Sequence, residues 1–267
     1  IAPGTCVGVM GGNSKQFIIM AFAVMECGAV VMPISNQISN GEVIEIIQAA
    51  KLSALLDDKS NVSPFTEKSS PFSCEGVEWR LYFNNRSNLS SHFATHVIDP
   101  ALIRFTSGTT GTSKGVILSH KTIYERTAAA NRGLQLNESD KIVWVLSMAY
   151  HFVVSIILYL RYGCSIIICK EFLADNIIEQ TNSHGGTFLY ASPMHIRLLH
   201  NDTSTRMMSS LKRVVSTSTA ISKDQCVKFT SRFKLPVSQA YGIIEIGLPI
   251  INFEKSELFP DAVGYAL

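Results

Sequence analysis

The segment FTSGTTGTSKG, which runs from Phe105 to Gly115, gathers hydroxyl residues, glycines and one lysine between two apolar runs. Glycines allow a ligand to approach the backbone closely, amides and hydroxyls donate hydrogen bonds, and a lysine supplies a mobile positive charge. These are the properties that a polyphosphate site requires. A solvent-exposed turn has a similar composition, so the order of the residues has to decide between the two.

The order excludes two common loops of nucleotide-binding proteins. A Walker loop requires glycine directly before its lysine, and here Ser113 precedes Lys114. The chain contains no G-x-G-x-x-G dinucleotide fingerprint. What remains is the order S-G-T-T-G-x-x-K-G between the apolar runs ALIRF and VILSH.

This order resembles the phosphate loop of the ANL superfamily of adenylate-forming enzymes, which is commonly [ST]-S-G-[ST]-T-G-x-P-K-G. Residues Thr106 to Gly115 match it at every position but one, since Ser113 stands where proline is usual. Further segments resemble that superfamily in the same order along the chain: VMGGNSKQFIIMAFAVMECGAVVMPI, SMAYHF, VVSTSTAIS, QAYGIIEIG and DAVGYAL. The resemblance therefore covers nearly the whole chain, and its phosphate loop and Tyr-Gly…Glu segment are the most specific parts.

The resemblance implies that the protein joins a carboxylic acid to ATP, with Mg²⁺, and passes the acyl group to coenzyme A or to the pantetheine of an acyl carrier protein. The implied nucleotide contacts are Thr106, Ser107, Gly108, Thr109, Thr110, Gly111, Lys114, Ser218, Thr219, Ala220, Tyr241 and Gly242. Tyr150 and His151 line the implied acid pocket, and Glu245 is the implied Mg²⁺ ligand. The implied catalytic residues are Lys114, Glu245 and His151.

Several of these residues also have a purely structural interpretation. Glu245 could be an ion-pair partner, although an isolated carboxylate in the apolar run GIIEIG would be costly to bury. His151 could be a core histidine, and Tyr150 could simply pack against its neighbours.

Two departures from the superfamily pattern concern the chemistry. Ile244 stands where a threonine usually precedes the glutamate and reaches the α-phosphate. The usual S-G-G-A-P-L-S is replaced by STSTAIS, residues Ser216 to Ser222, which is bulkier and should narrow the slot for the acid or the adenine. The favoured function is that of an acyl- or aryl-CoA ligase. The alternatives are an enzyme that loads a carrier protein and a nucleotide-binding relative without catalytic activity.

These residues must be positioned by an α/β fold. Apolar runs such as TCVGVM, AVVMPI, KIVWVL, TFLYA and KRVVS alternate with helical segments, which predicts mostly parallel sheets covered by helices. The resemblance implies the stacked αβαβα layers of the large N-terminal domain of adenylate-forming enzymes. It further implies that residues 1–267 form one such domain, incomplete at both ends and without the small C-terminal lid domain.

Capping signals predict where two of the helices begin and end. The first helix is expected to have Asn13 as N-cap, Gln16 in a capping box and Gly28 after its last turn. The second is expected to begin with a capping box of Ser39 and Glu42. Between residues 58 and 100 the Ser, Asn and Pro content predicts a long irregular connection with one strand at WRLYF.

The composition of the chain indicates which other classes of protein can be set aside. A chain of 267 residues with 46% apolar residues can bury a large core, and a net charge of +2 without a basic block argues against a nucleic-acid partner. The six cysteines form no CxxC motif and are expected to be buried thiols in the cytoplasm. Residues 142–160 carry no formal charge and could span a membrane by length alone. Polar residues near the centre of this stretch favour a buried strand–turn–helix instead.

Overall fold

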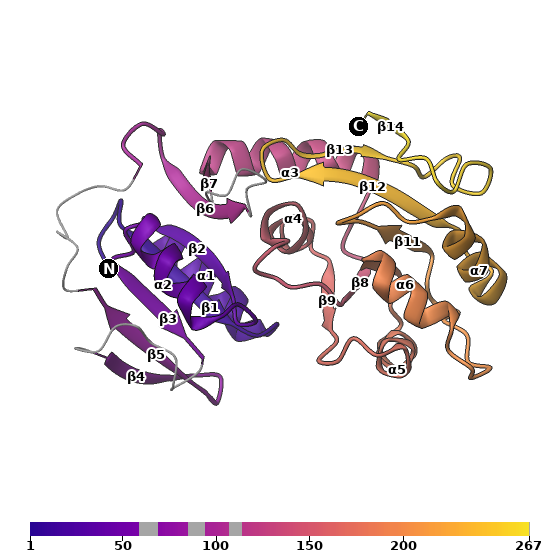
Figure 1. Cartoon of the computed structure of the whole chain (residues 1–267), viewed down its shortest axis with the longest axis horizontal. Helices are drawn as coiled ribbons and strands as arrows, with labels where there is room; N and C mark the ends of the chain where they lie inside the picture. Colours follow the sequence, from indigo (N-terminus) through magenta and orange to yellow (C-terminus); the bar gives the residue numbers. More distant parts are fainter. Residues whose placement is uncertain (59–68, 85–93, 107–113, 267) are drawn as a thin grey trace. The chain divides into compact units, whose positions relative to one another are not determined.

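A computed structural model describes residues 1–58, 69–84, 94–106 and 114–266. The chain divides into two compact units, and each contains one seven-stranded sheet (Figure 1). The first unit consists of Ile1–Tyr124 with Ser147–Phe152, and the second of Glu125–Leu146 with Val153–Leu267. Each unit is a mixed α/β structure, as the alternation of apolar runs and helical segments predicts. The expectation of one large domain over residues 1–267 stays a prediction.

The sheet of the first unit has the strand order β4-β5-β3-β1-β2-β6-β7. Its strands are β1 (Cys6–Gly11), β2 (Val30–Ser35), β3 (Ala54–Asp57), β4 (Ser69–Cys74), β5 (Val77–Phe83), β6 (Pro100–Thr106) and β7 (Lys114–Ser119). The central strands β3, β1, β2 and β6 are parallel, whereas β5 and β7 run antiparallel to their neighbours.

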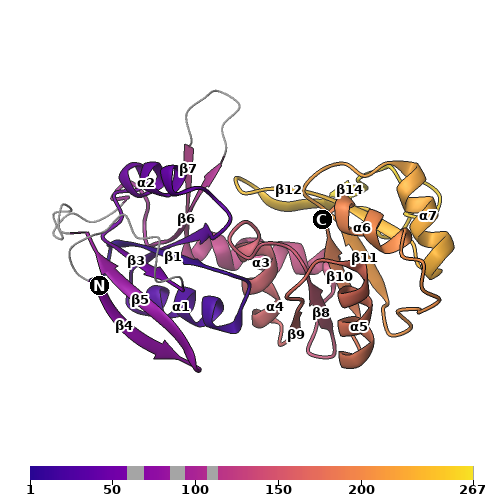
Figure 2. The same cartoon turned by 60° about the horizontal axis from the view of Figure 1, so that its bottom comes forward.

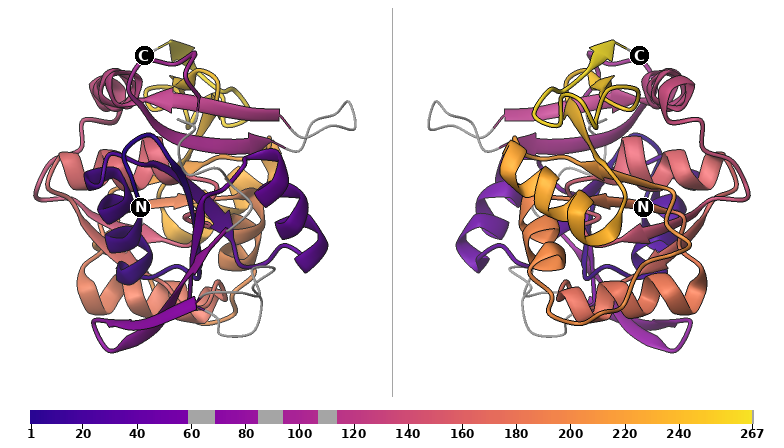
Figure 3. Two further views of the ribbon diagram at one scale, coloured as in Figure 1. Left: turned by 90° about the vertical axis from the view of Figure 1, so that its left-hand side faces the viewer. Right: turned by 90° about the vertical axis from the view of Figure 1, so that its right-hand side faces the viewer.

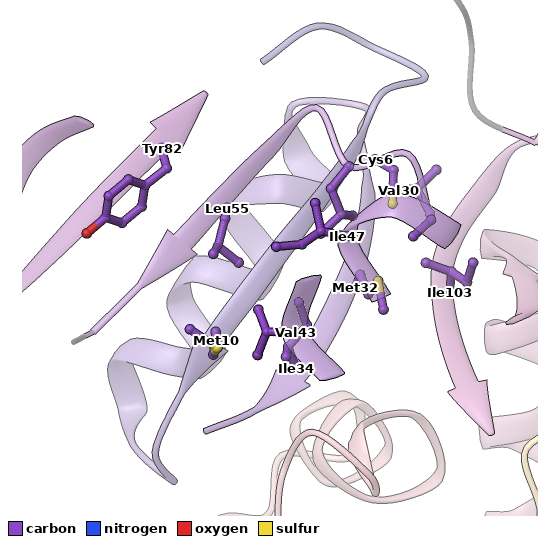
Figure 4. Close-up of a cluster of buried hydrophobic side chains, with 12 residues drawn as sticks. Cys6, Met10, Val30, Met32, Ile34, Val43, Ile47, Leu55, Tyr82 and Ile103 are labelled. Atoms are coloured by element: carbon purple, nitrogen blue, oxygen red, sulfur yellow. The ribbon is translucent and has the colours of Figure 1, made fainter. Parts of the chain in front are cut away.

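Helices α1 (Lys15–Glu26) and α2 (Asn40–Ala49) cover opposite faces of this sheet (Figure 3). The strand order explains why, because β2 and β3 lie on either side of β1 and right-handed crossovers to the two sides place their helices on opposite faces. Successive side chains of β1 alternate between the faces. Cys6 and Met10 belong to the cluster that Val43 and Ile47 of α2 complete (Figure 4).

The N-terminus of α1 differs from the prediction. Ser14, not Asn13, is the N-cap, and its Oγ accepts a hydrogen bond from the Phe17 amide at 3.1 Å. Asn13 is instead engaged far along the chain, since its Oδ1 accepts from the Met148 amide at 2.9 Å. Gln16 is buried. A local pattern cannot reveal which of two adjacent capping residues has a distant partner.

The other two capping predictions are confirmed. Gly28 follows the last turn of α1 with φ of 70°, a conformation that costs glycine nothing. Ser39 and Glu42 form the predicted capping box at the start of α2, with the Ser39 amide 2.8 Å from Glu42 Oε2.

The sheet of the second unit has the strand order β14-β13-β12-β11-β10-β8-β9. Its strands are β8 (Lys141–Trp144), β9 (Ser165–Ile168), β10 (Phe188–Ala191), β11 (Arg213–Ser216), β12 (Val237–Ile243), β13 (Gly247–Ile251) and β14 (Tyr265–Ala266). The helices are α3 (His120–Leu134, which begins in the first unit), the π-helix η1 (Phe152–Ile157), α4 (Leu158–Arg161), α5 (Ala174–His184), α6 (Pro193–His200) and α7 (Lys223–Phe233). Strands β9, β8, β10, β11 and β12 are parallel, and β13 and β14 continue the sheet in antiparallel fashion.

The uncharged stretch 142–160 forms strand β8, a turn, the π-helix and the start of α4, as the polar residues near its centre predict. Trp144 and Tyr159 of this stretch are buried: their rings lie 6.0 Å apart, and Trp144 stacks on Tyr190 at 6.3 Å. Within the described ranges, no helix has the length and apolar character needed to cross a bilayer.

Residues 58–100 contain more structure than predicted. Strand β5 includes the predicted WRLYF, but β4 pairs with it as an antiparallel hairpin that the sequence did not reveal. The side chains of β4 are exposed or partly exposed, so its residues SSPFSC show no alternation of apolar and polar positions. Residues 59–68 and 85–93 of the predicted connection lie outside the described residues.

All six cysteines are free thiols, and four are buried. Burial raises the pKa of Cys164, Cys169 and Cys226 to about 11 and that of Cys6 further still, so these thiols are unreactive. The expectation of burial is wrong for Cys27, which is exposed directly after α1, and Cys74 is partly exposed.

Candidate functional site

The predicted phosphate loop connects the two arms of a hairpin. Strands β6 and β7 run side by side, and Thr106 at the end of β6 pairs with Lys114 at the start of β7 (Figure 2). Lys114 is exposed at this position. A Cβ at Gly115 would lie 2.9 Å from Cδ1 of Ile103, the end of a flexible side chain on the neighbouring strand. The remaining predicted contacts lie outside the described residues: Ser107, Gly108, Thr109, Thr110 and Gly111.

The segment with Tyr150 and His151 belongs to the first unit and is fixed at its start by Asn13. Besides the bond from the Met148 amide to Asn13, the Tyr150 amide donates to the Ser147 carbonyl at 3.2 Å and the His151 amide to the Met148 carbonyl at 3.3 Å. Tyr150 is 39% exposed, so a ligand can reach it.

Arg104 of β6 joins this segment and was not anticipated from the sequence. Its guanidinium carbon lies 5.5 Å from the centroid of the Tyr150 ring. Burial, helped by the positive charge of Arg104, lowers the pKa of His151 to about 4. The His151 imidazole is therefore neutral at pH 7, which excludes a permanent positive charge at this position.

In the second unit, the carboxyl ends of β11 and β12 lie next to each other. Ser216 at the end of β11 pairs in parallel with Gln239 of β12, so the loop that follows β11 runs beside Tyr241. Ligands of open α/β sheets bind at this edge. The predicted nucleotide contacts gather here, and all of them are exposed: Ser218, Thr219, Ala220, Tyr241 and Gly242.

Buried polar contacts hold the loop after β11 in place. The amide of Thr217 donates to the Ala191 carbonyl at 2.9 Å, and the amide of Ile221 donates to Oε1 of Gln239 at 3.3 Å. Gln239 is itself fixed, because its Nε2 donates to the Pro260 carbonyl at 2.9 Å. The loop between these anchors presents its side chains to solvent.

Gly242 has a structural reason to be glycine. A Cβ at this position would lie 2.6 Å from the Gly247 carbonyl oxygen on the neighbouring strand β13. Gly247 has φ of 87°, which also favours glycine. The two glycines therefore allow the β12–β13 hairpin to close, and the nucleotide contact of Gly242 stays a prediction.

Glu245 lies in the turn between β12 and β13 and is exposed. Because the carboxylate is exposed, it avoids the free-energy cost of burial that the apolar run GIIEIG suggests. Arg126 of α3 donates from Nη1 to the Ile244 carbonyl and from Nη2 to the Glu245 carbonyl. Nothing in the local sequence indicates this contact, since Arg126 and Ile244 are 118 residues apart.

Glu245 can serve as a Mg²⁺ ligand only together with the phosphate oxygens of a bound nucleotide. The described residues contain no group of three or more His, Cys, Asp or Glu side chains that could hold a metal by themselves. An exposed carboxylate is nevertheless the type of ligand that Mg²⁺ prefers, and this ion commonly combines one or two carboxylates with substrate phosphates.

The structure thus brings the predicted residues together in three groups. Thr106 and Lys114 pair in the first unit, and the same unit places Tyr150 and His151 with Arg104. The third group is in the second unit, at the carboxyl edge of β11 and β12, and comprises Ser218, Thr219, Ala220, Tyr241, Gly242 and Glu245.

The chain belongs to the family described as AMP-binding enzyme, whose profile matches residues 1–267. The sulfoacetate–CoA ligase of Cupriavidus necator is 31% identical over 156 residues, which are 57% of this chain and 30% of that protein. The polyketide synthase–nonribosomal peptide synthetase phmA of Phaeosphaeria nodorum is 25% identical in an alignment of 275 positions that covers 98% of this chain and 7% of that protein.

The fold is that of adenylate-forming enzymes. ATP-bound MatB from Rhodopseudomonas palustris superposes with a TM-score of 0.79 at 18% identity, covering 100% of this chain and 55% of that one. The chain thus spans about half the length of this solved structure and smaller shares of the two relatives above.

Proposed function

We propose that the protein activates a carboxylic acid with ATP and then transfers the acyl group to the thiol of coenzyme A. A carboxylate oxygen of the acid attacks the α-phosphorus of ATP, the bond to pyrophosphate breaks, and an acyl-adenylate and pyrophosphate form. The thiolate then attacks the acyl carbon, and AMP leaves. The six free cysteines suit a reducing compartment, so we propose the cytoplasm as the location.

The observation that carries the proposal is the pairing of Ser216 with Gln239. It brings an exposed loop, Ser218–Ala220, and an exposed aromatic ring, Tyr241, to the same carboxyl edge, where an adenine can lie between them. The match of the AMP-binding family along residues 1–267 supports a nucleotide at this edge.

The other residues have roles that follow from their chemistry. Lys114 is exposed at the start of β7. It would contact the β- and γ-phosphates together with the hydroxyl residues between Thr106 and Lys114. Glu245 would bind Mg²⁺, which neutralises phosphate charge as pyrophosphate leaves. Tyr150 and His151 would contact the acid, and the lowered pKa of His151 means that it does so as a neutral group.

Two alternatives have a specific observation in their favour. The similarity to a nonribosomal peptide synthetase favours transfer to the pantetheine of a carrier protein in place of coenzyme A. Ile244 lacks the hydroxyl that the superfamily resemblance leads one to expect next to the glutamate, which favours a nucleotide-binding protein without catalytic activity.

Isotope exchange between pyrophosphate and ATP tests the proposal, measured on the whole native protein across a panel of carboxylic acids. Acid-dependent exchange is expected. ATP binding without exchange for any acid would contradict the adenylation step and favour the non-catalytic alternative. With an acid that supports exchange, thioester formation with coenzyme A, compared with a phosphopantetheinylated carrier protein, identifies the acceptor.

A further inference from the structure

The turn that carries Glu245 is held from helix α3 by one side chain. The two terminal nitrogens of Arg126 donate to two consecutive carbonyls, those of Ile244 and Glu245. The stem of the same side chain lies against Gly247, where a Cβ would be 3.4 Å from Arg126 Cδ. Arg126 thus bonds two consecutive carbonyls of the turn, and its stem leaves no spare room beside Gly247.

The geometry of the contact restricts the turn. A guanidinium is a planar fork with fixed donor directions, so binding two consecutive carbonyls fixes the orientation of both peptide groups. Across the base of the turn, the Ile246 amide donates to the Ile243 carbonyl at 3.2 Å. With its carbonyls held by Arg126, the turn presents the side chain of Glu245 in a restricted set of directions.

The charge of Arg126 is partly shielded from water at this position. Burial lowers the pKa of Arg126, and the negative charge of Glu245 opposes that shift. An arginine in such a site remains protonated at neutral pH. Its charge would repel a cation bound at Glu245, whereas its hydrogen bonds would pre-orient the carboxylate for that cation.

We infer that Arg126 is a positioning residue that directs the Glu245 carboxylate toward the metal ion of a bound Mg·ATP. The inference rests on the proposed function, because it requires Glu245 to contact that metal. Loss of positioning weakens the preference for metal-bound nucleotide, whereas loss of repulsion would strengthen it. The sign of the effect therefore distinguishes the two contributions of Arg126.

The test compares the dissociation constant of ATP in excess Mg²⁺ with that in EDTA, by calorimetry, for four variants of the chain. Arg126→Lys keeps the charge but loses the fork, Arg126→Met loses both, and Glu245→Gln removes the proposed ligand. Arg132→Met is the matched control, because Arg132 is an exposed arginine on the same helix. The metal-dependent gain in affinity is the ratio of the dissociation constant in EDTA to that in Mg²⁺. We expect this ratio to fall roughly fivefold to tenfold in both Arg126 variants and to stay unchanged in Arg132→Met.

Amide hydrogen exchange provides a second measurement that does not depend on nucleotide. In Arg126→Lys, the amides from Glu245 to Gly247 should exchange several-fold faster, while those of β11 remain protected. Melting temperatures show whether each variant is folded. If Arg126→Met does not fold, Arg126→Lys decides the matter, because its long cationic side chain can still donate to one of the two carbonyls.

The outcomes separate the inference from the proposed function. If the unchanged chain binds no ATP, or if Glu245→Gln keeps the full metal-dependent gain, the proposed function is wrong at this site and the inference is overturned with it. If Glu245→Gln loses the gain while the Arg126 variants keep or increase it, only the inference is overturned. Unchanged exchange of the turn in Arg126→Lys would also overturn it.

Discussion

Ser218 occupies a backbone conformation that favours glycine. Its φ is 77°, which places a non-glycine residue in the left-handed region. The residue follows β11 and is exposed at the edge where the proposed adenine site lies. The superfamily segment that STSTAIS resembles has glycine at the equivalent position, and a serine there carries strain that a glycine would avoid.

Replacing Ser218 with glycine should therefore stabilise the protein. A left-handed conformation costs an L-residue about 1–2 kcal/mol, and the extra freedom of glycine in the unfolded chain offsets about 0.4–1 kcal/mol of this. We expect Ser218→Gly to raise the free energy of unfolding in urea by roughly 0.5–1 kcal/mol. Thr219→Gly, at the next position, should lower it instead, and a gain of equal size there would contradict the strain at Ser218.

Ile244 allows a direct test of the missing hydroxyl. Arg126 holds the carbonyl of Ile244, so the backbone position does not depend on its side chain. Threonine is also β-branched and should fit. If a phosphate lies there, Ile244→Thr should tighten the binding of a non-hydrolysable acyl-adenylate analogue by about 0.5–1.5 kcal/mol, up to tenfold.

Calorimetry with that analogue measures the effect, and Ile246→Thr is the control, since Ile246 is 52% exposed on the same turn. Equal effects of the two substitutions would mean that the gain is not specific to position 244. Weaker binding by a folded Ile244→Thr variant would show that the isoleucine packs against the ligand.

Among the elements, the β12–β13 hairpin depends on close backbone contact. A methyl group at Gly242 would meet the Gly247 carbonyl at 2.6 Å, and a backbone oxygen cannot move as a flexible side chain can. Gly242→Ala should therefore cost about 1–3 kcal/mol of the free energy of unfolding. Gly41→Ala should do the opposite, because Gly41 is exposed in helix α2, where alanine gains up to about 1 kcal/mol. Thermal unfolding of both variants checks the two signs, and a neutral Gly242→Ala would contradict the close contact.

The first turn of helix α6 contains a buried histidine that should make stability depend on pH. His195 is 5% exposed, its Nδ1 lies 2.7 Å from Ser192 Oγ, and burial lowers its pKa from 6.5 to about 4. Between these pH values the unfolded chain binds a proton that the folded chain does not. The stability that the neutral His195 contributes is therefore complete above pH 6.5 and is lost as the pH falls toward 4.

His195→Gln should remove this contribution while keeping the capping box, since glutamine serves the same position. The difference in unfolding free energy between the unchanged chain and this variant should change by at most about 3 kcal/mol between pH 7 and pH 4. Urea titrations at several pH values measure it. Other groups, including His151, titrate alike in both proteins, so their contributions cancel in the difference between the two unfolding free energies. A difference that stays constant with pH would contradict the lowered pKa.

Capping and periodicity patterns in the sequence predicted most helices and strands. The features they did not predict depend on contacts between residues far apart in the chain. The Ser39–Glu42 capping box and the αL glycine after α1 involve residues close in sequence, and they are confirmed. The N-cap of α1 was misplaced because the partner of Asn13 is Met148. Arg104 and Arg126 show no motif of their own, since their partners lie in other elements.

For the whole molecule, the family assignment rests on a match along residues 1–267 and on the fold. The predicted site residues are distributed over both units: Lys114, Tyr150 and His151 lie in the first, and Ser218, Tyr241 and Glu245 in the second. In the proposed function, the carboxyl edge of β11 and β12 binds the adenine of ATP.

Photolabelling with 8-azido-ATP tests this claim most directly, because the azide reacts with residues next to the bound adenine. After photolysis of the purified chain and proteolysis, mass spectrometry identifies the labelled peptides. We expect labelling between residues 216 and 222 or between 238 and 246, abolished by excess unlabelled ATP and undiminished by excess inorganic phosphate. ATP-competed labelling that falls entirely outside these two segments would contradict it.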